Sequence, residues 1–224
     1  MMKPTIDPLW VTDIEAAKVL QNSLREKVIP QDQLGKVERI AGVDVAFAEN
    51  RTITKAAVVI LSYPDLTILE TAIAQTPTTF PYVPGYLSFR EIPAILQVLE
   101  KISLTPDLIF CDGQGIAHPR RLGIASHLGV LMDIPTIGVA KSILVGKHEP
   151  VPPEKGQWVP LVDQQEMIGV ALRSRINVKP LYLSLGHKIS LETAIAYVQS
   201  CLVKYRLPEP TRLADKLSKG LNLA

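Results

Sequence analysis

The chain has 224 residues, enough for one domain with a substantial core and short for two, so a single domain over residues 1–224 is expected. With 47% hydrophobic and 21% charged residues it is near the globular average, which excludes a disordered chain, a collagen and a disulfide scaffold. Lys and Arg total 24 against 22 Asp and Glu, but the residues after Leu172 include 9 basic and only 3 acidic ones. This basic C-terminal quarter fits a phosphate-facing surface or, equally, a solvated lysine-rich one.

The sequence indicates neither a membrane span nor a secretion signal. Apolar runs such as 56–61 stop well short of the roughly 18 residues that suggest a span. Asp7 interrupts the start of the chain, where a signal peptide needs an apolar stretch. Cys111 lies inside an apolar run, so it and Cys201 are expected to be buried thiols in a reducing compartment. We therefore expect a cytoplasmic protein.

The first predicted element is a helix that starts at a capping box. Thr12 and Glu15 have the spacing at which a threonine oxygen and a glutamate satisfy each other's free backbone donors, and Pro30 closes the segment. Three strand-like runs with short separators follow, and strands so tightly connected must form an antiparallel meander. These runs are 40–47, 56–61 and 66–73.

After the meander, helices and strands alternate. Apolar spacing predicts a helix that begins near Ile92, with Pro93 in its first turn. The runs 108–111 and 136–140 are wholly apolar, as in parallel strands covered on both faces, and a helix-length segment at 118–132 separates them. The other expected elements are strands of unassigned order at 157–162, 167–172 and 181–183, a helix at 191–203, a loop with Pro208 and Pro210, and a short basic tail. These elements predict an α/β fold, with a mixed sheet between helices on both faces.

Asp44 breaks the apolar pattern of the first strand. Alternation sends its valine neighbours and Phe47 to one face of the sheet and Asp44 to the other, with Gly42 and Ala46. Burial of an acid is costly unless a cation or hydrogen-bond donors compensate it. Asp44 is therefore either a functional group or an acceptor for a neighbouring loop.

Asp112 opens a polar run, DGQGIAHPRR at 112–121, directly after an apolar strand. In open α/β sheets, ligands collect at the carboxyl ends of strands, and glycines let a ligand approach the main chain. His118 and Arg120 are expected within one turn of a helix start, which favours phosphate. An acidic cap on a glycine turn would not require His118 and two arginines, so we favour a functional site.

Glu91 and Lys141 are further candidates. Ser88 and Glu91 also have the spacing of a capping box. A helix that starts there would put Pro93 past its first turn, where proline costs a hydrogen bond. Glu91 is therefore either a helix cap or a third carboxylate of the site. Lys141 follows an apolar strand and would place a positive charge near a substrate phosphate. The other histidines show no ligand spacing, which disfavours zinc, and carboxylate oxygens favour magnesium or manganese.

The loop 80–86 holds Tyr82 between two prolines. Such a rigid aromatic side chain suits a wedge in a base stack, and an apolar turn that covers the core explains the loop nearly as well. The spacing of the residues does not choose between these two interpretations.

Together these motifs resemble the endonuclease V family, the inosine-directed DNA repair nucleases with a ribonuclease H-like fold. The resemblance runs over about residues 12–219 and is most specific from Asp112 to Arg121. Its other blocks are Asp44, PYVP at 81–84, FRE at 89–91, GVAKS at 138–142 and PTRLAD at 210–215. It implies an endonuclease that flips hypoxanthine out of DNA and cuts the second phosphodiester bond on the 3′ side, leaving 3′-hydroxyl and 5′-phosphate ends.

The resemblance implies roles for the polar candidates. Asp44, Glu91 and Asp112 would bind Mg²⁺, for which Mn²⁺ can substitute, and Asp215 would lie near a second metal position, where relatives carry aspartate or histidine. His118 and Lys141 would lie at the scissile phosphate. Further phosphate contacts are expected from Arg120 and Arg121.

The resemblance also implies a base-recognition site. The wedge would consist of Pro81, Tyr82, Val83 and Pro84. The displaced base would enter a pocket made largely of main-chain groups near Leu87, Gly113, Gly123, Ile124 and Leu144.

Three alternatives concern the substrate and the activity. The wedge argues against a different ribonuclease H-like nuclease, and the complete set of four acids argues against a non-catalytic nucleic-acid binder. Inosine-containing RNA stays open as the main substrate, because some relatives prefer it. We expect a monomer that binds damaged DNA and no membrane.

Overall fold

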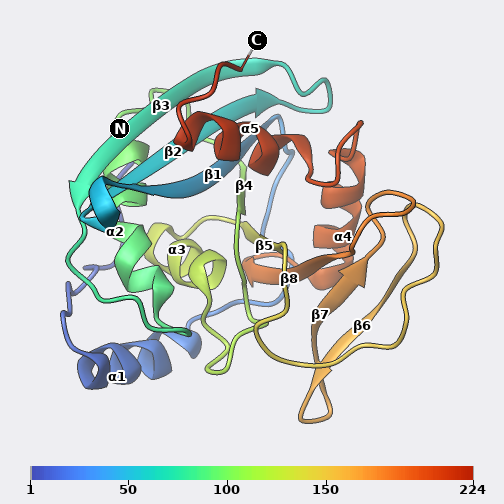
Figure 1. Cartoon of the computed structure of the whole chain (residues 1–224), viewed down its shortest axis with the longest axis horizontal. Helices are drawn as coiled ribbons and strands as arrows, with labels where there is room; N and C mark the ends of the chain where they lie inside the picture. The colour runs from blue at the N-terminus through green and yellow to red at the C-terminus, as the bar shows by residue number, and fades with distance from the viewer. Residues whose placement is uncertain (1, 224) are drawn as a thin grey trace.

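The computed structural model describes residues 2–223, and a single eight-stranded sheet runs through it (Figure 1). The strand order is β3-β2-β1-β4-β5-β8-β7-β6. The strands are β1 (Arg39–Ala48), β2 (Ile53–Ser62), β3 (Ile68–Pro77), β4 (Leu108–Cys111), β5 (Thr136–Ala140), β6 (Trp158–Asp163), β7 (Glu166–Leu172) and β8 (Leu181–His187). The predicted meander is confirmed, because β1, β2 and β3 pair antiparallel. The parallel strands are confirmed too, since β4 pairs parallel with both β1 and β5.

The three strands whose order the sequence left open extend the far side of the sheet. β8 pairs antiparallel with β5, and β7 and β6 follow as an antiparallel hairpin. The sheet is therefore antiparallel at both ends and parallel only in its centre. That centre places the carboxyl ends of β4 and β5 next to β1, where the polar candidates lie.

Helices cover both faces of the sheet, as expected. They are α1 (Ile14–Arg25), α2 (Leu87–Leu99), α3 (Ile124–Met132), α4 (Leu191–Ser200) and α5 (Glu209–Ser218). The two-residue period of β2 divides its side chains, so that Val58 and Ile60 join the core under α2 and α3, while Val59 and Leu61 pack against α5. α4 lies on this second face too, where it packs over β5, β7 and β8.

Two helix starts differ from the prediction. α1 is capped by Asp13, whose carboxylate accepts from the Ala16 N–H at 2.8 Å, and not by Thr12. α2 begins at Leu87, well before Ile92, so that Pro93 lies inside the helix. Burial of Phe89 and Ile92 against the core outweighs the backbone hydrogen bond that Pro93 cannot make.

One helix prediction and one loop prediction were also wrong. The segment predicted as a helix at 118–132 is helical only from Ile124, after a loop that ends at Gly123. The expected C-terminal loop and tail contain α5, because Pro208 occupies its N-cap and Pro210 its first turn, where proline costs no hydrogen bond.

The two cysteines are buried and free, as expected. Among residues 2–223, no helix has the length and apolar character needed to cross a bilayer.

Candidate active site

Three carboxylates meet near the centre of the sheet. Asp44 lies on β1, Asp112 directly follows β4, and Asp215 lies on α5. β1 and β4 are parallel neighbours with Val43 opposite Cys111, which brings the next residue of each strand side by side. One carboxylate oxygen from each of the three acids lies within 4.8 Å of the others. The structure therefore brings together three of the four acids expected to bind metal, Asp44, Asp112 and Asp215, and Glu91 lies outside this cluster.

The position of Asp215 depends on how closely α5 approaches β1. A side chain at Gly42 would place its Cβ 1.9 Å from the Pro210 carbonyl oxygen, so only glycine permits this packing. One turn further along, Leu213 and Ala214 pack on β2. The last turn of α5 then carries Ser218, whose hydroxyl donates to the Asp44 carboxylate. The helix thus supplies both an acid and a hydrogen-bond donor to the cluster.

The cluster is short of positive charge at its buried end. Burial, with the nearby negative charge of Asp112, raises the pKa of Asp44 to about 7. At the exposed end, the Lys141 ammonium donates to Asp112 and to Asp215 Oδ1, the latter at 2.8 Å. Lys219 donates to Asp215 Oδ2 at 2.6 Å. Burial alone would raise the pKa of Asp215, but these two lysines lower it.

Glu91 faces this cluster from α2 and does not cap that helix. Burial raises the pKa of Glu91 to about 8, and the negative charges of Asp44 and Asp112 add to the shift. Ser88, its proposed capping partner, lies inside α2 and pairs with His127 Nδ1 at 3.0 Å. The capping interpretation of Glu91 was therefore wrong. Its carboxylate is instead close enough to Asp44 and Asp112 for their negative charges to affect its pKa.

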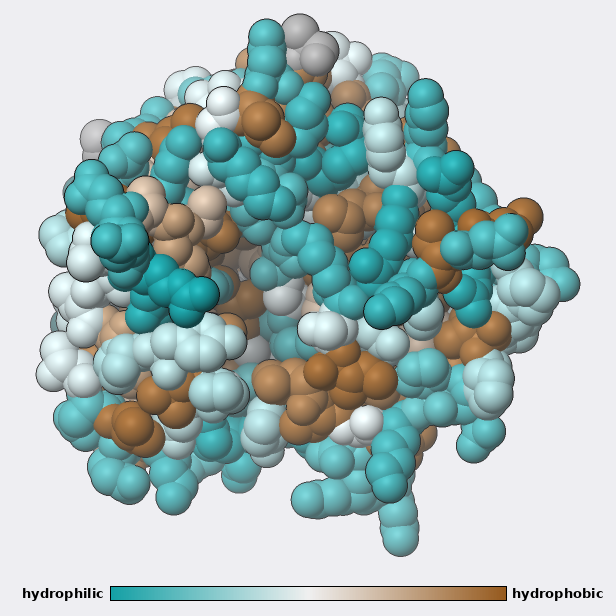
Figure 2. All heavy atoms as spheres, in the orientation of Figure 1, coloured by the Kyte–Doolittle hydropathy of each residue, from teal (hydrophilic) through white to brown (hydrophobic). Residues whose placement is uncertain are grey.

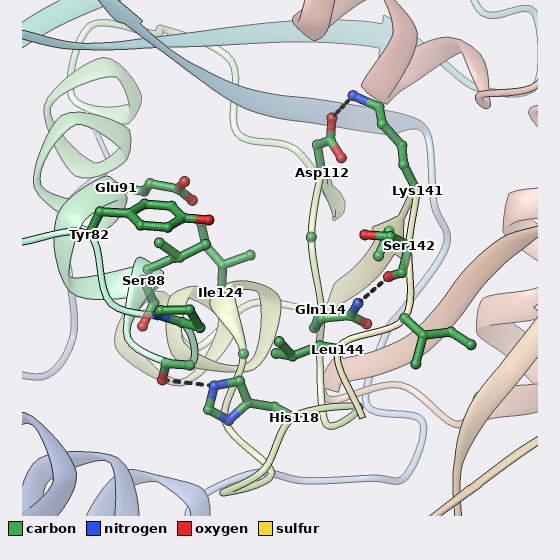
Figure 3. Close-up of a pocket in the computed structure, with 17 residues that line it drawn as sticks. Tyr82, Ser88, Glu91, Asp112, Gln114, His118, Ile124, Lys141, Ser142 and Leu144 are labelled. Carbon is green, nitrogen blue, oxygen red and sulfur yellow. Dashed lines mark hydrogen bonds and ion pairs between the residues drawn. The ribbon is translucent and has the colours of Figure 1, made fainter. Parts of the chain in front are cut away.

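The acids border a cavity of about 390 Å³. Figure 3 shows Asp112 and Lys141 on one side of it and Tyr82, Ser88 and Glu91 on the other. In the space-filling view, a hollow opens near the middle of this face, with apolar side chains around it and hydrophilic ones above (Figure 2). All five residues expected to form the base pocket line the cavity, namely Leu87, Gly113, Gly123, Ile124 and Leu144.

The aromatic residues of the loop before α2 differ in their exposure. Phe80 and Tyr86 are buried and pack with Phe89, and Val83 is partly buried against them. Tyr82 is 60% exposed and lines the cavity with Pro84, while Pro81 is exposed. The core-covering role thus belongs to Phe80 and Tyr86, which leaves Tyr82 at the rim of the cavity.

His118 lies in the loop before α3, and its expected place in the first turn of a helix was wrong. The Arg120 N–H donates to His118 Nδ1 at 3.2 Å, so Nε2 carries the proton and donates to the Gly85 carbonyl at 2.9 Å. Burial and the neighbouring Arg120 lower the pKa of His118 to about 4. His118 is therefore a neutral imidazole in the cavity wall, on the side away from the carboxylates (Figure 3).

The two arginines expected to contact phosphate both have protein partners. Arg120 donates to the Gly85 carbonyl at 2.6 Å and lies over the Tyr86 ring, 4.1 Å from its centroid. Arg121 pairs with Asp163 and Glu166, at the turn between β6 and β7, at 2.9 Å and 2.8 Å. In this structure Arg120 orders the loop before α2, and Arg121 ties the β6–β7 hairpin to the cavity loop.

Sequence reasoning missed Ser218 and Gln114. Ser218 follows Asp215 by three residues, so recognising α5 as a helix would have placed both on one face. Gln114 lines the cavity and donates from Nε2 to the Ser142 carbonyl at 2.9 Å, which joins the loops after β4 and β5. Its place in the DGQG segment was visible, but its partner depends on the tertiary fold.

Comparison with known proteins agrees with this geometry. The family model described as Endonuclease V matches residues 22–216. An Endonuclease V from Rippkaea orientalis is 66% identical over 207 residues, which are 92% of this chain and 90% of the relative. The crystal structure of Endonuclease V from Streptomyces avermitilis is 42% identical, with a TM-score of 0.90 over 96% of this chain and 95% of that one.

A further solved structure holds a nucleic acid. It is a Ciona intestinalis Endonuclease V variant in complex with a 23mer DNA that contains an inosine followed by a ribo-adenosine. It is 33% identical to this chain, with a TM-score of 0.81 and coverage of 94% of this chain and 98% of that one.

Fold, site and relatives together define a nuclease with a ribonuclease H-like fold. The family model and the relatives show, more narrowly, that the chain belongs to the Endonuclease V family. The resemblance in the sequence motifs is thereby confirmed.

Proposed function

We propose that the protein is a metal-dependent endonuclease that recognises deaminated bases, above all hypoxanthine, in DNA. The base is flipped into the cavity, and the second phosphodiester bond on its 3′ side is hydrolysed, leaving 3′-hydroxyl and 5′-phosphate ends. The observation that carries the proposal is the carboxylate cluster at the edge of a cavity of about 390 Å³, large enough for one base. The inosine-containing DNA bound by the Ciona relative supports the substrate, and the cleavage position follows from the family resemblance.

The residues at the cluster fit a hard divalent cation. Asp44, Asp112 and Asp215 offer only oxygen ligands. Burial and the neighbouring Asp112 together raise the pKa of Asp44, so a bound cation would stabilise its carboxylate. These acids, with Glu91 from the opposite wall, would hold Mg²⁺, or Mn²⁺ in its place. Such an ion, when bound, supplies charge for the scissile phosphate and lowers the pKa of water.

Other side chains of the chain prepare the phosphate site. The Lys141 ammonium lies between Asp112 and Asp215, so it adds positive charge at the point where a phosphodiester would approach these acids. Ser218 fixes the orientation of the Asp44 carboxylate. His118 stays neutral and holds the Gly85 carbonyl, which fixes the cavity wall rather than transferring a proton.

Base recognition belongs to the cavity and its rim. Extrusion of a base costs a few kcal/mol, and less at a mispaired inosine, so a lesion is favoured before any contact is made. The N–H groups of Gly113 and Gly123 already donate to the Val139 and Gly115 carbonyls. The first turn of α3, which begins at Ile124 in the cavity wall, offers backbone N–H groups to the ring oxygen of hypoxanthine, and main-chain carbonyls of the wall can accept its N1–H. Tyr82, exposed at the rim, is placed to fill the gap in the stack.

The test uses end-labelled DNA and RNA oligomers of one sequence, each with a single inosine or adenine at the same position. We expect cleavage of inosine DNA in magnesium and none in excess chelator, and the RNA arm measures the preference between the two nucleic acids. Asp112→Asn should abolish turnover and leave lesion binding measurable, because the base cavity stays intact. Asp65→Asn, on the exposed turn between β2 and β3, is the matched control and should cleave normally. Full-rate cleavage by Asp112→Asn would overturn the metal assignment.

A further inference from the structure

The segment between α4 and α5 contains a loop, Val203–Arg206, that is held firmly against the active site. The Arg206 guanidinium donates to three main-chain carbonyls, those of Lys179, Pro180 and Lys141, at 2.8–2.9 Å. The Lys141 carbonyl belongs to the residue whose ammonium bonds Asp112 and Asp215. The loop is therefore fixed to the same short segment that places a lysine in the carboxylate cluster.

This fixed loop points apolar side chains at solvent. Cys201 and Leu202 are buried, but Val203 is 63% and Tyr205 47% exposed, with exposed Lys204 between them. The Arg212 guanidinium lies over the Tyr205 ring, 4.5 Å from its centroid, and is itself held by Glu209. The ring is thus ordered in advance and still half accessible, which suits stacking because little conformational entropy remains to be lost on binding.

The loop contacts the main chain of Lys141 at the carboxylate cluster and does not line the base cavity. Tyr82 and Glu91 form one wall of the cavity, and Asp112 with Lys141 forms the other (Figure 3). Arg206 contacts the Lys141 carbonyl from the loop. Arg212, which supports the Tyr205 ring, precedes Asp215 by one turn of α5. A strand with its base in the cavity and a phosphate at the acids would next reach Val203–Arg206.

The charge of this region matches such a strand. Lys204, Arg206 and Arg212 lie within nine residues that hold one acid, Glu209, the partner of Arg212, in the quarter of the chain that has 9 basic and 3 acidic residues after Leu172. Cations beside an accessible aromatic ring are the combination that binds single-stranded nucleic acid, through phosphates and base stacking.

We propose that Val203–Arg206 is a second nucleic-acid contact, which holds the strand on the 3′ side of the scissile bond. Tyr205 stacks on an unpaired base and Lys204 neutralises a phosphate. The proposal rests on the proposed function, which sets the polarity of the strand, and it extends the binding surface beyond the base cavity and the wedge.

The test measures binding in chelator, so that no substrate is cut. The ligands are single-stranded oligomers with inosine or adenine at one position and a 3′ flank of about two or about ten nucleotides. The wild type should bind the longer flank more tightly. Tyr205→Ala should remove roughly five- to 150-fold of affinity for the long flank and leave the short-flank affinity unchanged, as expected for one base–aromatic contact. Tyr205→Phe keeps the ring and should bind like the wild type. Lengthening the 5′ flank instead should not distinguish the variants.

Lys204→Gln is the second variant, because the exposed lysine can be replaced without disturbing α5. It should also weaken binding of the long-flank oligomer selectively. If Tyr205→Ala lowers the melting temperature, Lys204→Gln becomes the variant that tests the contact. Equal losses on both flanks, or no gain from a 3′ flank in the wild type, would overturn this contact. If the wild type does not distinguish inosine from adenine at either length, the proposed function fails instead.

Discussion

His118 is neutral at physiological pH because of its surroundings. It is 3% exposed, and burial together with Arg120 lowers its pKa to about 4. The unfolded chain takes up this proton near pH 6.5, so between pH 6.5 and 4 the unfolded state binds more protons than the folded state. Stability from this residue is therefore present above pH 6.5 and is lost as the pH falls through that window.

We expect His118→Gln to reduce the acid sensitivity of folding. Glutamine cannot take up the proton, so the variant should lose up to about 3 kcal/mol less stability than the wild type between pH 6.5 and 4. Urea denaturation across this range measures the difference. His148→Gln, at the surface, controls for removal of a histidine. The buried His127, whose pKa is lowered to about 3, keeps some acid sensitivity in every variant. Parallel curves for wild type and His118→Gln would mean that His118 is not the buried neutral group.

At the scale of elements, α5 assembles the cluster, because Asp215 and Ser218 both reach the acids from it. Its approach to β1 depends on Gly42, where a Cβ would lie 1.9 Å from the backbone oxygen of Pro210. Backbone cannot yield as a flexible side chain does, so a methyl group at this position must push the helix away from the sheet.

Gly42→Ala should therefore damage stability and catalysis together. We expect a loss of about 1–3 kcal/mol in unfolding free energy from overpacking. A displaced Asp215 should also lower the cleavage rate by roughly 100-fold. Gly35→Ala is the control, since a Cβ there meets no atom within 4 Å. Unfolding curves and single-turnover cleavage test both effects. A Gly42→Ala protein with wild-type rate and stability would contradict the role assigned to α5.

The central strands and the acids they carry could be predicted from the sequence, but α5 could not. Asp44 and Asp112 stand out because each interrupts or ends an apolar run, a purely local signal. Asp215 and Ser218 have no such signal, since the two prolines before them are typical of a loop until the helix packs on Gly42. Likewise, Pro93 suggested a late start for α2, because the burial that overrides it is a tertiary effect.

On the scale of the whole molecule, charge is divided unevenly along the chain. The residues up to Leu172 include 15 basic and 19 acidic ones, and the rest include 9 and 3, so net charges of −4 and +6 add to the total of +2. Within the basic part, Lys219 pairs with Asp215 and Arg206 donates to the Lys141 carbonyl, so part of the excess positive charge lies at the cluster, where the scissile phosphate would bind. Association with a polyanion should depend on this side of the molecule.

We accordingly expect binding of inosine DNA to weaken steeply with salt, because each phosphate contact releases condensed counterions. The slope of log affinity against log salt should be negative, by about 0.7 per phosphate contacted on a single strand. Titrations in chelator at several salt concentrations measure it. Lys204→Gln should make the slope shallower by about one contact, whereas Lys36→Gln, at the opposite end of β1, should leave it unchanged. A flat response from low to physiological salt would mean that few phosphates are touched, and equal slopes for both variants would place those contacts away from the C-terminal loop.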